Sequence, residues 1–87
     1  MAVDLKYTCT AVQQKVLAAN PYRTYALLIN DGTDPIYLAL NKPAEVNRGI
    51  RLNAGGGSFE INLNNPYQGE VYAVGSAANP PLLISEY

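Results

Sequence analysis

Apolar residues alternate with polar ones in short runs along this chain, and nearly every run ends at Asn, Gly or Pro. In residues 58–63, for example, Phe59, Ile61 and Leu63 fall on one face and polar residues fall on the other. A period of two is typical of a β-strand that turns one face toward a core. No window sustains a helical period, so the pattern predicts an all-β chain.

Seven or eight short strands are predicted, at regular spacing and with turn residues between them. Such spacing is typical of a small antiparallel β-sandwich or a partly open barrel. With 87 residues, the chain can form a single domain around one modest core. The predicted strands cover residues 12–17, 23–30, 36–40, 50–52, 58–63, 71–74 and 82–85.

The chain divides into two parts. Residues 12–87 are predicted to form a single β-sandwich domain. Residues 1–11 are predicted to be an N-terminal arm or an edge strand, because residues 4–10 alternate weakly and lack an obvious hairpin partner. Such a segment could pair with the edge of a neighbour's sheet by strand addition.

Two connections carry strong turn signals. Residues 31–35 read Asp-Gly-Thr-Asp-Pro, and Asp-Gly readily takes positive φ, so residues 23–40 are predicted to form a β-hairpin. Residues 55–57 are three glycines, which predict a positive-φ hairpin connection. A phosphate-binding loop would need Gly-Lys-Ser/Thr at the start of a helix, whereas Ser58 continues into a strand pattern.

The sequence offers no arrangement of residues suited to catalysis. Histidine is absent, so Cys9 and the serines have no evident base to activate them. The seven acidic residues are scattered over turns and polar strand faces. A small hydrolase using Glu60 and Glu70 would need the fold to bring these two carboxylates together. We predict that the protein is not an enzyme.

No cofactor or metal site is predicted. Asp31 and Asp34 could bind calcium weakly, but their loop lacks the repeated oxygen-ligand spacing of an EF-hand. Turn residues that hydrogen-bond their own backbone explain them better. A lone cysteine excludes an intrachain disulfide and a cysteine-based metal cluster, so Cys9 is predicted to be a small buried hydrophobe.

Charge and hydropathy limit the partners that can be expected. The formal net charge is −1, which gives no electrostatic reason to bind nucleic acid or an anionic bilayer. No stretch approaches the roughly 20 apolar residues that cross a membrane, and the first residues do not resemble a signal peptide. Charged residues make up 15% of the chain, so uncharged polar residues and tyrosine are predicted to form most of the surface.

Tyrosine is the residue type most suited to binding here, because its flat amphipathic ring contacts partners at low entropic cost. The alternative is that individual tyrosines cap a thin core with the hydroxyl group in solvent. Sugar recognition would normally recruit tryptophan, which the chain lacks. The interface candidates are Tyr22, Tyr37, Tyr67, Tyr72 and Tyr87.

Short motifs follow one another over roughly residues 12–86. An Ala-Asn-Pro turn precedes an Arg-x-Tyr-x-Leu-Leu-Ile strand, an Ile-Tyr-Leu strand, a Gly-Ile-Arg-Leu segment, a Gly-Gly pair, an Asn-Pro-Tyr-x-Gly turn and a Val-Tyr-Ala-Val strand. This order resembles that of small β-sandwich structural proteins of tailed bacteriophages. The motifs occupy residues 19–21, 23–30, 36–38, 49–52, 55–56, 65–69 and 71–74.

The resemblance implies a non-enzymatic virion component. The leading expectation is a capsid decoration (cement) protein that is located in the virion, binds the major capsid protein or other virion proteins, and forms a homo-oligomer. The alternative is a receptor- or carbohydrate-binding accessory module of a head fibre or tail. Neither nucleic acid nor a membrane is expected as a partner.

Overall fold

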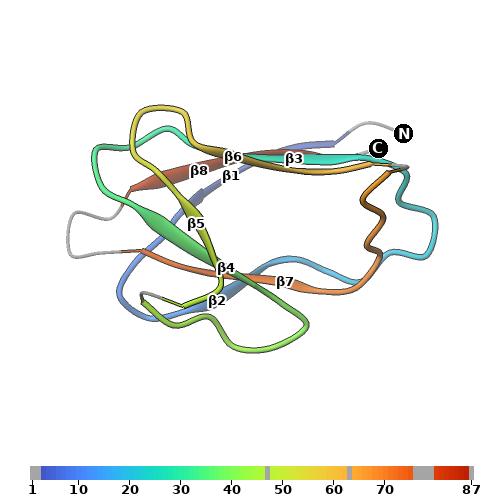
Figure 1. Ribbon diagram of the computed structural model, residues 1–87, viewed down its shortest axis with the longest axis horizontal. Helices are drawn as coiled ribbons and strands as arrows, with labels where there is room; N and C mark the ends of the chain where they lie inside the picture. The colour runs from blue at the N-terminus through green and yellow to red at the C-terminus, as the bar shows by residue number, and fades with distance from the viewer. Residues whose placement is uncertain (1–2, 47, 63, 76–79, 87) are drawn as a thin grey trace.

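The structure, a computed structural model, describes residues 3–46, 48–62, 64–75 and 80–86. These residues form two four-stranded antiparallel sheets packed face to face (Figure 1). Sheet A has the order β1-β8-β3-β6, and sheet B has the order β2-β7-β4-β5. The prediction of a small antiparallel β-sandwich is confirmed. The strands are β1 (Val3–Thr8), β2 (Gln14–Leu17), β3 (Ala26–Asn30), β4 (Ile36–Leu40), β5 (Ile50–Leu52), β6 (Ser58–Ile61), β7 (Val71–Val74) and β8 (Pro81–Glu86).

The strand pairs show how the chain wraps around its core. β1 pairs with β8, β2 with β7, β3 with β6 and β4 with β5, so the chain folds back on itself as one long hairpin. The β4–β5 connection is the tip of that hairpin. Two further pairs, β3–β8 and β4–β7, join its segments into the two sheets. A double sheet of eight strands wrapped in this way has the jelly-roll topology.

The core lies between the sheets and follows the period of two. In β3, Ala26 and Leu28 point inward and are fully buried, whereas Leu27 and Ile29 point outward and are partly exposed. Cys9 is a free cysteine that is fully buried, as predicted. The main cluster of buried apolar residues is Cys9, Val16, Leu17, Ala26, Leu28, Ile36, Leu38, Leu52, Ile61, Val71, Ala73, Leu82 and Ile84.

The predicted hairpin over residues 23–40 is wrong. β3 belongs to sheet A and β4 to sheet B, so the connection between them crosses from one sheet to the other. The crossing is fixed by Asn30, which is fully buried. Its Nδ2 donates to the carbonyl oxygens of Asp34 at 2.7 Å and Leu52 at 3.0 Å, and its Oδ1 accepts from the Gly32 N–H at 2.9 Å. These bonds replace the ladder that a hairpin would have formed.

The glycine run at residues 55–57 also crosses between sheets, because β5 lies in sheet B and β6 in sheet A. The predicted hairpin is therefore wrong here as well, although Gly55 and Gly56 do have positive φ, of 76° and 114°. The Gly56 N–H donates to the Asn30 carbonyl oxygen at 2.8 Å. This bond places the two crossings side by side at one end of the sandwich (Figure 1).

The N-terminal segment forms the edge of sheet A. β1 pairs with β8 from Val3↔Glu86 to Thr8↔Pro81, so its partner comes from the opposite end of the chain. Sequence proximity could not reveal this pairing, because the two strands are separated by the whole domain. The strand predicted over residues 58–63 is shorter in the structure, because β6 ends at Ile61, and Leu63 lies outside the described residues.

Candidate interaction surface

The outer face of sheet A has an apolar centre. Leu83 on β8 lies directly opposite Ile29 on β3, and Leu27 lies two residues away on the same strand and the same face. All three side chains are partly exposed. We call Leu27, Ile29 and Leu83 the apolar patch. It lies on β8 and β3, the two central strands of sheet A.

Polar residues border the apolar patch on both sides. On β1, Asp4 lies opposite Ser85 and Lys6 lies opposite Leu83, and both charged residues are exposed. On β6, Glu60 lies opposite Leu27 and is also exposed. An apolar centre with a polar rim is the composition that protein–protein interfaces share.

The outer face of sheet B is covered by the chain itself. Tyr37, Ala39 and Val74 point away from the main core, yet they are only 7%, 6% and 3% exposed. Ala44, from the β4–β5 connection, packs with them in a second cluster and is 5% exposed. This connection runs below sheet B in Figure 1. The two faces therefore differ: sheet B is closed by a loop, and the central strands of sheet A are open.

The five candidate tyrosines do not form one surface. Tyr22, in the β2–β3 connection, is 86% exposed. Tyr37 is buried in the second cluster, so it is a structural residue and the prediction that it lies at an interface is wrong. The covering loop is the physical reason, since strand periodicity alone places Tyr37 on an outer face. Tyr87 lies outside the described residues.

Tyr67 and Tyr72 are partly buried and meet at Glu70. The Tyr72 hydroxyl donates to Glu70 Oε1 at 2.7 Å, and the Tyr67 hydroxyl donates to the Glu70 carbonyl oxygen at 2.6 Å. Lys15 Nζ lies 3.2 Å from Glu70 Oε2. The pKa of Glu70 is lowered, mainly by the hydrogen bond from Tyr72 and next by the one from Lys15. The Tyr72–Glu70 hydrogen bond also raises the pKa of Tyr72. Both hydroxyl groups are thus committed within the chain.

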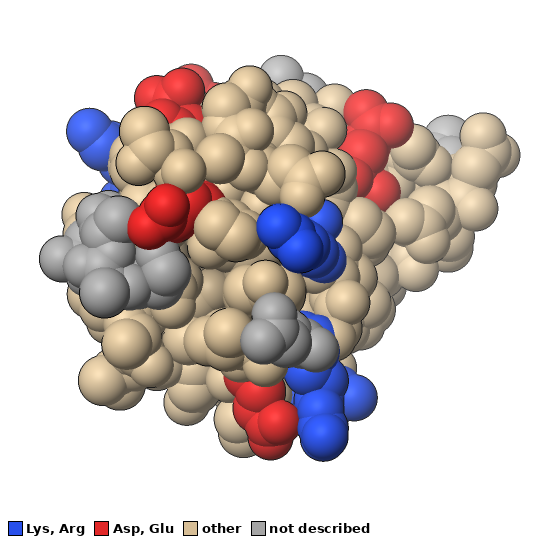
Figure 2. All heavy atoms as spheres, turned by 60° about the vertical axis from the view of Figure 1, so that its left-hand side comes forward, with Lys and Arg blue, Asp and Glu red and all other residues tan. Residues whose placement is uncertain are grey.

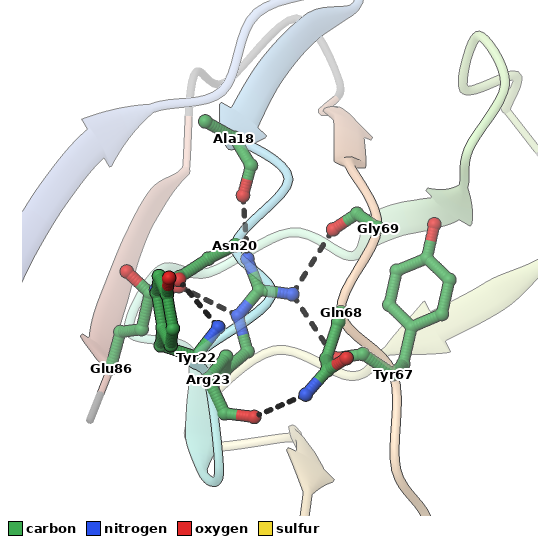
Figure 3. Close-up of polar contacts among 8 residues, drawn as sticks. All are labelled: Ala18, Asn20, Tyr22, Arg23, Tyr67, Gln68, Gly69 and Glu86. Atoms are coloured by element: carbon green, nitrogen blue, oxygen red, sulfur yellow. Dashed lines mark hydrogen bonds and ion pairs between the residues drawn. The ribbon is translucent and has the colours of Figure 1, made fainter.

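A buried arginine lies at the end of the sandwich opposite the β3–β4 and β5–β6 connections and fastens the chain there (Figure 3). Arg23 is 2% exposed, and its Nε donates to Glu86 Oε2 on β8 at 2.6 Å. Its Nη1 donates to the carbonyl oxygens of Tyr67 and Gly69, and its Nη2 donates to that of Ala18. Because these partners come from β8 and from the β2–β3 and β6–β7 connections, Arg23 holds the fold and is not available to a ligand.

The charged groups that catalysis would need lie apart or are unreactive. Glu60 accepts from the Tyr25 hydroxyl in sheet A, whereas Glu70 precedes β7 in sheet B and bonds Lys15 and Tyr72. Burial raises the pKa of the Cys9 thiol to about 11, so at neutral pH the nucleophilic thiolate is almost absent. Among the described residues, no three metal-ligating side chains come together, Asp31 and Asp34 included.

A shallow hollow of about 170 Å³ lies beneath the β4–β5 connection. Lys42, Arg48 and Glu45 contribute to its walls, and Arg48 Nε forms an exposed ion pair with Glu45 Oε2 at 3.3 Å. Arg48 and Glu45 thus offset each other's charge, and Lys42 adds a further positive charge. These charged side chains are exposed, whereas the polar groups that fix a small ligand are usually held in a deeper, largely apolar pocket.

The surface shown in Figure 2 is mostly uncharged, with acidic and basic side chains in small separate groups. The low density of charge on this face agrees with the 15% of charged residues in the sequence. In the described part of the chain, no helix has the length and apolar character needed to cross a membrane.

Comparison of the chain with family models, curated proteins and solved structures gave no match. The apolar patch was not among the sequence-derived candidates. Its signal was present, however, because residues 26–29 are apolar on both strand faces. A strand with one face in a core and the other in water would not need Leu27 and Ile29 on its outer side.

Proposed function

We propose that this chain is a non-enzymatic structural protein of a tailed-bacteriophage virion, a capsid decoration protein that binds the assembled shell and stabilises it. The observation that carries the proposal is the apolar patch on the open face of sheet A. Leu27, Ile29 and Leu83 offer an apolar area with a polar rim on the outside of a sheet, which suits a protein partner and not a small molecule.

The internal chemistry supports a structural role. Arg23, Asn30 and Glu70 each direct their side-chain hydrogen bonds to other parts of the chain and so fasten the fold. A net charge of −1 allows many copies to lie close together without strong mutual repulsion. A shell that carries many symmetric sites multiplies weak contacts through effective concentration. The order of sequence motifs, which resembles that of phage structural proteins, points in the same direction.

The proposed occupant of the apolar patch is the outer surface of the major capsid protein or of another virion shell protein. The rim residues Asp4, Lys6 and Glu60 carry both signs of charge, so the patch does not select a strongly charged surface. Membranes and nucleic acids, which need a basic face, are therefore poor partners for it.

The test is co-sedimentation of the protein with expanded phage capsids. Leu83→Ser is expected to weaken capsid binding by at least about tenfold, because loss of a central interface side chain typically costs more than about 1.4 kcal/mol at a hot spot. Val46→Ser is the matched control, because Val46 is a 53% exposed apolar residue on the β4–β5 connection. Circular dichroism checks that both variants fold.

Two results would contradict the proposal. The first is a wild-type protein that binds no phage shell under any condition. The second is a Leu83→Ser variant that binds shells as tightly as the wild type, which would remove the apolar patch from the interface.

The alternative, a receptor- or carbohydrate-binding accessory module, is less well supported. It needs several exposed tyrosine rings on one platform. Among the described candidates, Tyr22 is largely exposed, Tyr37 is buried, and Tyr67 and Tyr72 are partly buried with their hydroxyl groups engaged. A glycan array with wild-type protein and Tyr22→Ala tests this alternative, and saturable binding that the substitution weakens would favour it.

A further inference from the structure

The outer edge of β1 presents unpaired backbone groups. The Cys9 N–H donates to the Pro80 carbonyl oxygen at 3.0 Å, just beyond the β1–β8 ladder. Because hydrogen-bonded pairs alternate in antiparallel sheets, Tyr7 and Leu5 also direct their N–H and C=O groups toward β8. The N–H and C=O groups of Asp4 and Lys6 therefore point away from β8, to the free edge of sheet A.

The far end of this edge is closed by a side chain. Thr8, Lys6 and Asp4 are alternate residues of β1, so their carbonyl oxygens point to the same side of the strand. The Thr8 carbonyl oxygen accepts a hydrogen bond from Gln14 Nε2 at 2.9 Å. This bond confirms the direction of the alternate groups. It also leaves Asp4 and Lys6 as the described residues of β1 at which another strand could add.

The inward side chains of β1 are incompletely covered. Leu5 and Tyr7 pack against the main core but remain partly exposed. Their partners on β8, Ile84 and Leu82, are 2% and 0% exposed. The difference arises because β8 has a strand on each side and β1 has a strand on one side only. A strand added beside β1 would complete the cover of Leu5 and Tyr7.

We propose that a second copy of this chain docks on this edge, with the two β1 strands antiparallel about a twofold axis that passes beside Leu5. In this register Asp4 lies opposite the partner's Lys6, and Lys6 lies opposite the partner's Asp4. Each of these pairs exchanges two backbone hydrogen bonds, because all the groups concerned point to the free edge. The opposite charges are also cross-strand neighbours on one face of the joined sheet.

Charge complementarity selects this register over its neighbours. A twofold axis at Asp4 would place the two Asp4 side chains opposite each other, and an axis at Lys6 would do the same with the two lysines. Both arrangements set like charges in direct cross-strand pairs, which is destabilising. An axis between two residues would oppose outward-pointing backbone groups with inward-pointing ones, so the ladder could not form.

This inference rests on the proposed function and deepens it, because it names the surface through which copies associate. The two copies of sheet A would join into one eight-stranded sheet. Their two apolar patches would then lie on one continuous outer face. A shell that offers neighbouring sites could bind both patches at once, which raises the apparent affinity without any new contact.

The experiment is sedimentation equilibrium of the purified protein without capsids, over a wide concentration range. Asp4→Lys and Lys6→Asp are each expected to weaken dimerisation by about tenfold or more, because each replaces two attractive pairs per dimer with two repulsive ones. The double variant that carries both substitutions restores the opposite pairing and is expected to dimerise within about threefold of the wild type.

Two controls separate charge pairing from other effects. Ser85→Ala removes the hydrogen bond that Ser85 Oγ donates to Asp4 Oδ1, at 2.8 Å, without changing any charge at the edge. Lys42→Asp makes the same change of charge as Lys6→Asp but on the β4–β5 connection. Both are expected to dimerise as the wild type does.

A wild-type protein that stays monomeric at every concentration would overturn the inference, and so would single variants that dimerise normally. If a monomeric wild type binds capsids and loses that binding with Lys6→Pro, the edge takes a strand of a shell protein instead of a second copy. Failure of the decoration role itself would appear only in the capsid co-sedimentation experiment, so the two failures remain distinguishable.

Discussion

Sheets A and B are built from the same kind of strand, yet they present opposite outer faces. Sheet B buries Tyr37 and Ala39 on its outer side, because the β4–β5 connection folds back and packs Ala44 against them. In the part of the chain that the structure describes, no comparable loop covers Leu27 and Leu83, which stay partly exposed. The difference teaches that an outward apolar residue stabilises the fold where a loop covers it and is free to bind a partner where none does.

The largest expected effect concerns Arg23, which joins β8 to the β2–β3 and β6–β7 connections. Arg23→Ala removes one partner of a buried ion pair and leaves the carbonyl oxygens of Tyr67, Gly69 and Ala18 without their donor. Breaking such a pair costs about 3–5 kcal/mol of unfolding free energy. Urea denaturation followed by circular dichroism measures this loss.

Arg51→Ala is the matched control for Arg23→Ala, because Arg51 is exposed on the outer side of β5. Its free energy of unfolding is expected to change by no more than about 0.5 kcal/mol. Equal losses for the two arginines would show that the buried contacts of Arg23 do not stabilise the end of the sandwich at which it lies.

The sequence predicted where strands lie better than it predicted which strands pair. Strands 36–40, 50–52 and 71–74 agree with β4, β5 and β7, since turn residues and alternation are local signals. The hairpin over residues 23–40 failed because Asp-Gly suits either a hairpin or a crossing. Asn30 held the missing information, as it occupies the same inward row as Ala26 and Leu28. A polar residue in a core row must find buried partners, and those lie across the sandwich.

The candidate surface could be anticipated only in part. Periodicity places both Tyr37 and Leu27 on outer strand faces, but it does not say which of the two faces a distant loop covers. Exposure of Tyr37 depends on how the β4–β5 connection packs, which is a tertiary property. The pairing of β1 with β8 was hidden for a similar reason, because it joins the two ends of the chain.

The second effect tests the covered face against the open one. Tyr37→Ala leaves a cavity beneath the β4–β5 connection and is expected to cost about 3 kcal/mol, as for other large aromatic residues in cores. Leu83→Ser, on the open face, is expected to cost about 1 kcal/mol or less, because its side chain is already partly in water. Thermal or urea unfolding of both variants gives the comparison, with Tyr22→Ala as an exposed aromatic control.

If Leu83→Ser destabilises the protein as much as Tyr37→Ala does, the outer face of sheet A is part of the structural core. The apolar patch would then lose its claim to be a binding surface. If Tyr37→Ala is harmless, the β4–β5 connection does not close sheet B, and the two faces are alike.

The smallest effect sharpens the contrast at the rim of sheet B. The hydrogen bonds from Tyr72 and Lys15 lower the folded-state pKa of Glu70 below its ordinary value of 4.5. A carboxyl group whose pKa is lowered in the folded state contributes stability that is complete above its unfolded-state pKa. This stability is lost as the pH falls through the folded-state pKa.

The melting temperature is therefore expected to fall slightly more between pH 5 and the acid limit in the wild type than in Glu70→Gln, which keeps an amide acceptor for Tyr72 at every pH. The contribution is small because Lys15 and Glu70 are both substantially exposed. Parallel pH profiles for the two proteins would show that the ionised Glu70 carboxylate does not stabilise the fold.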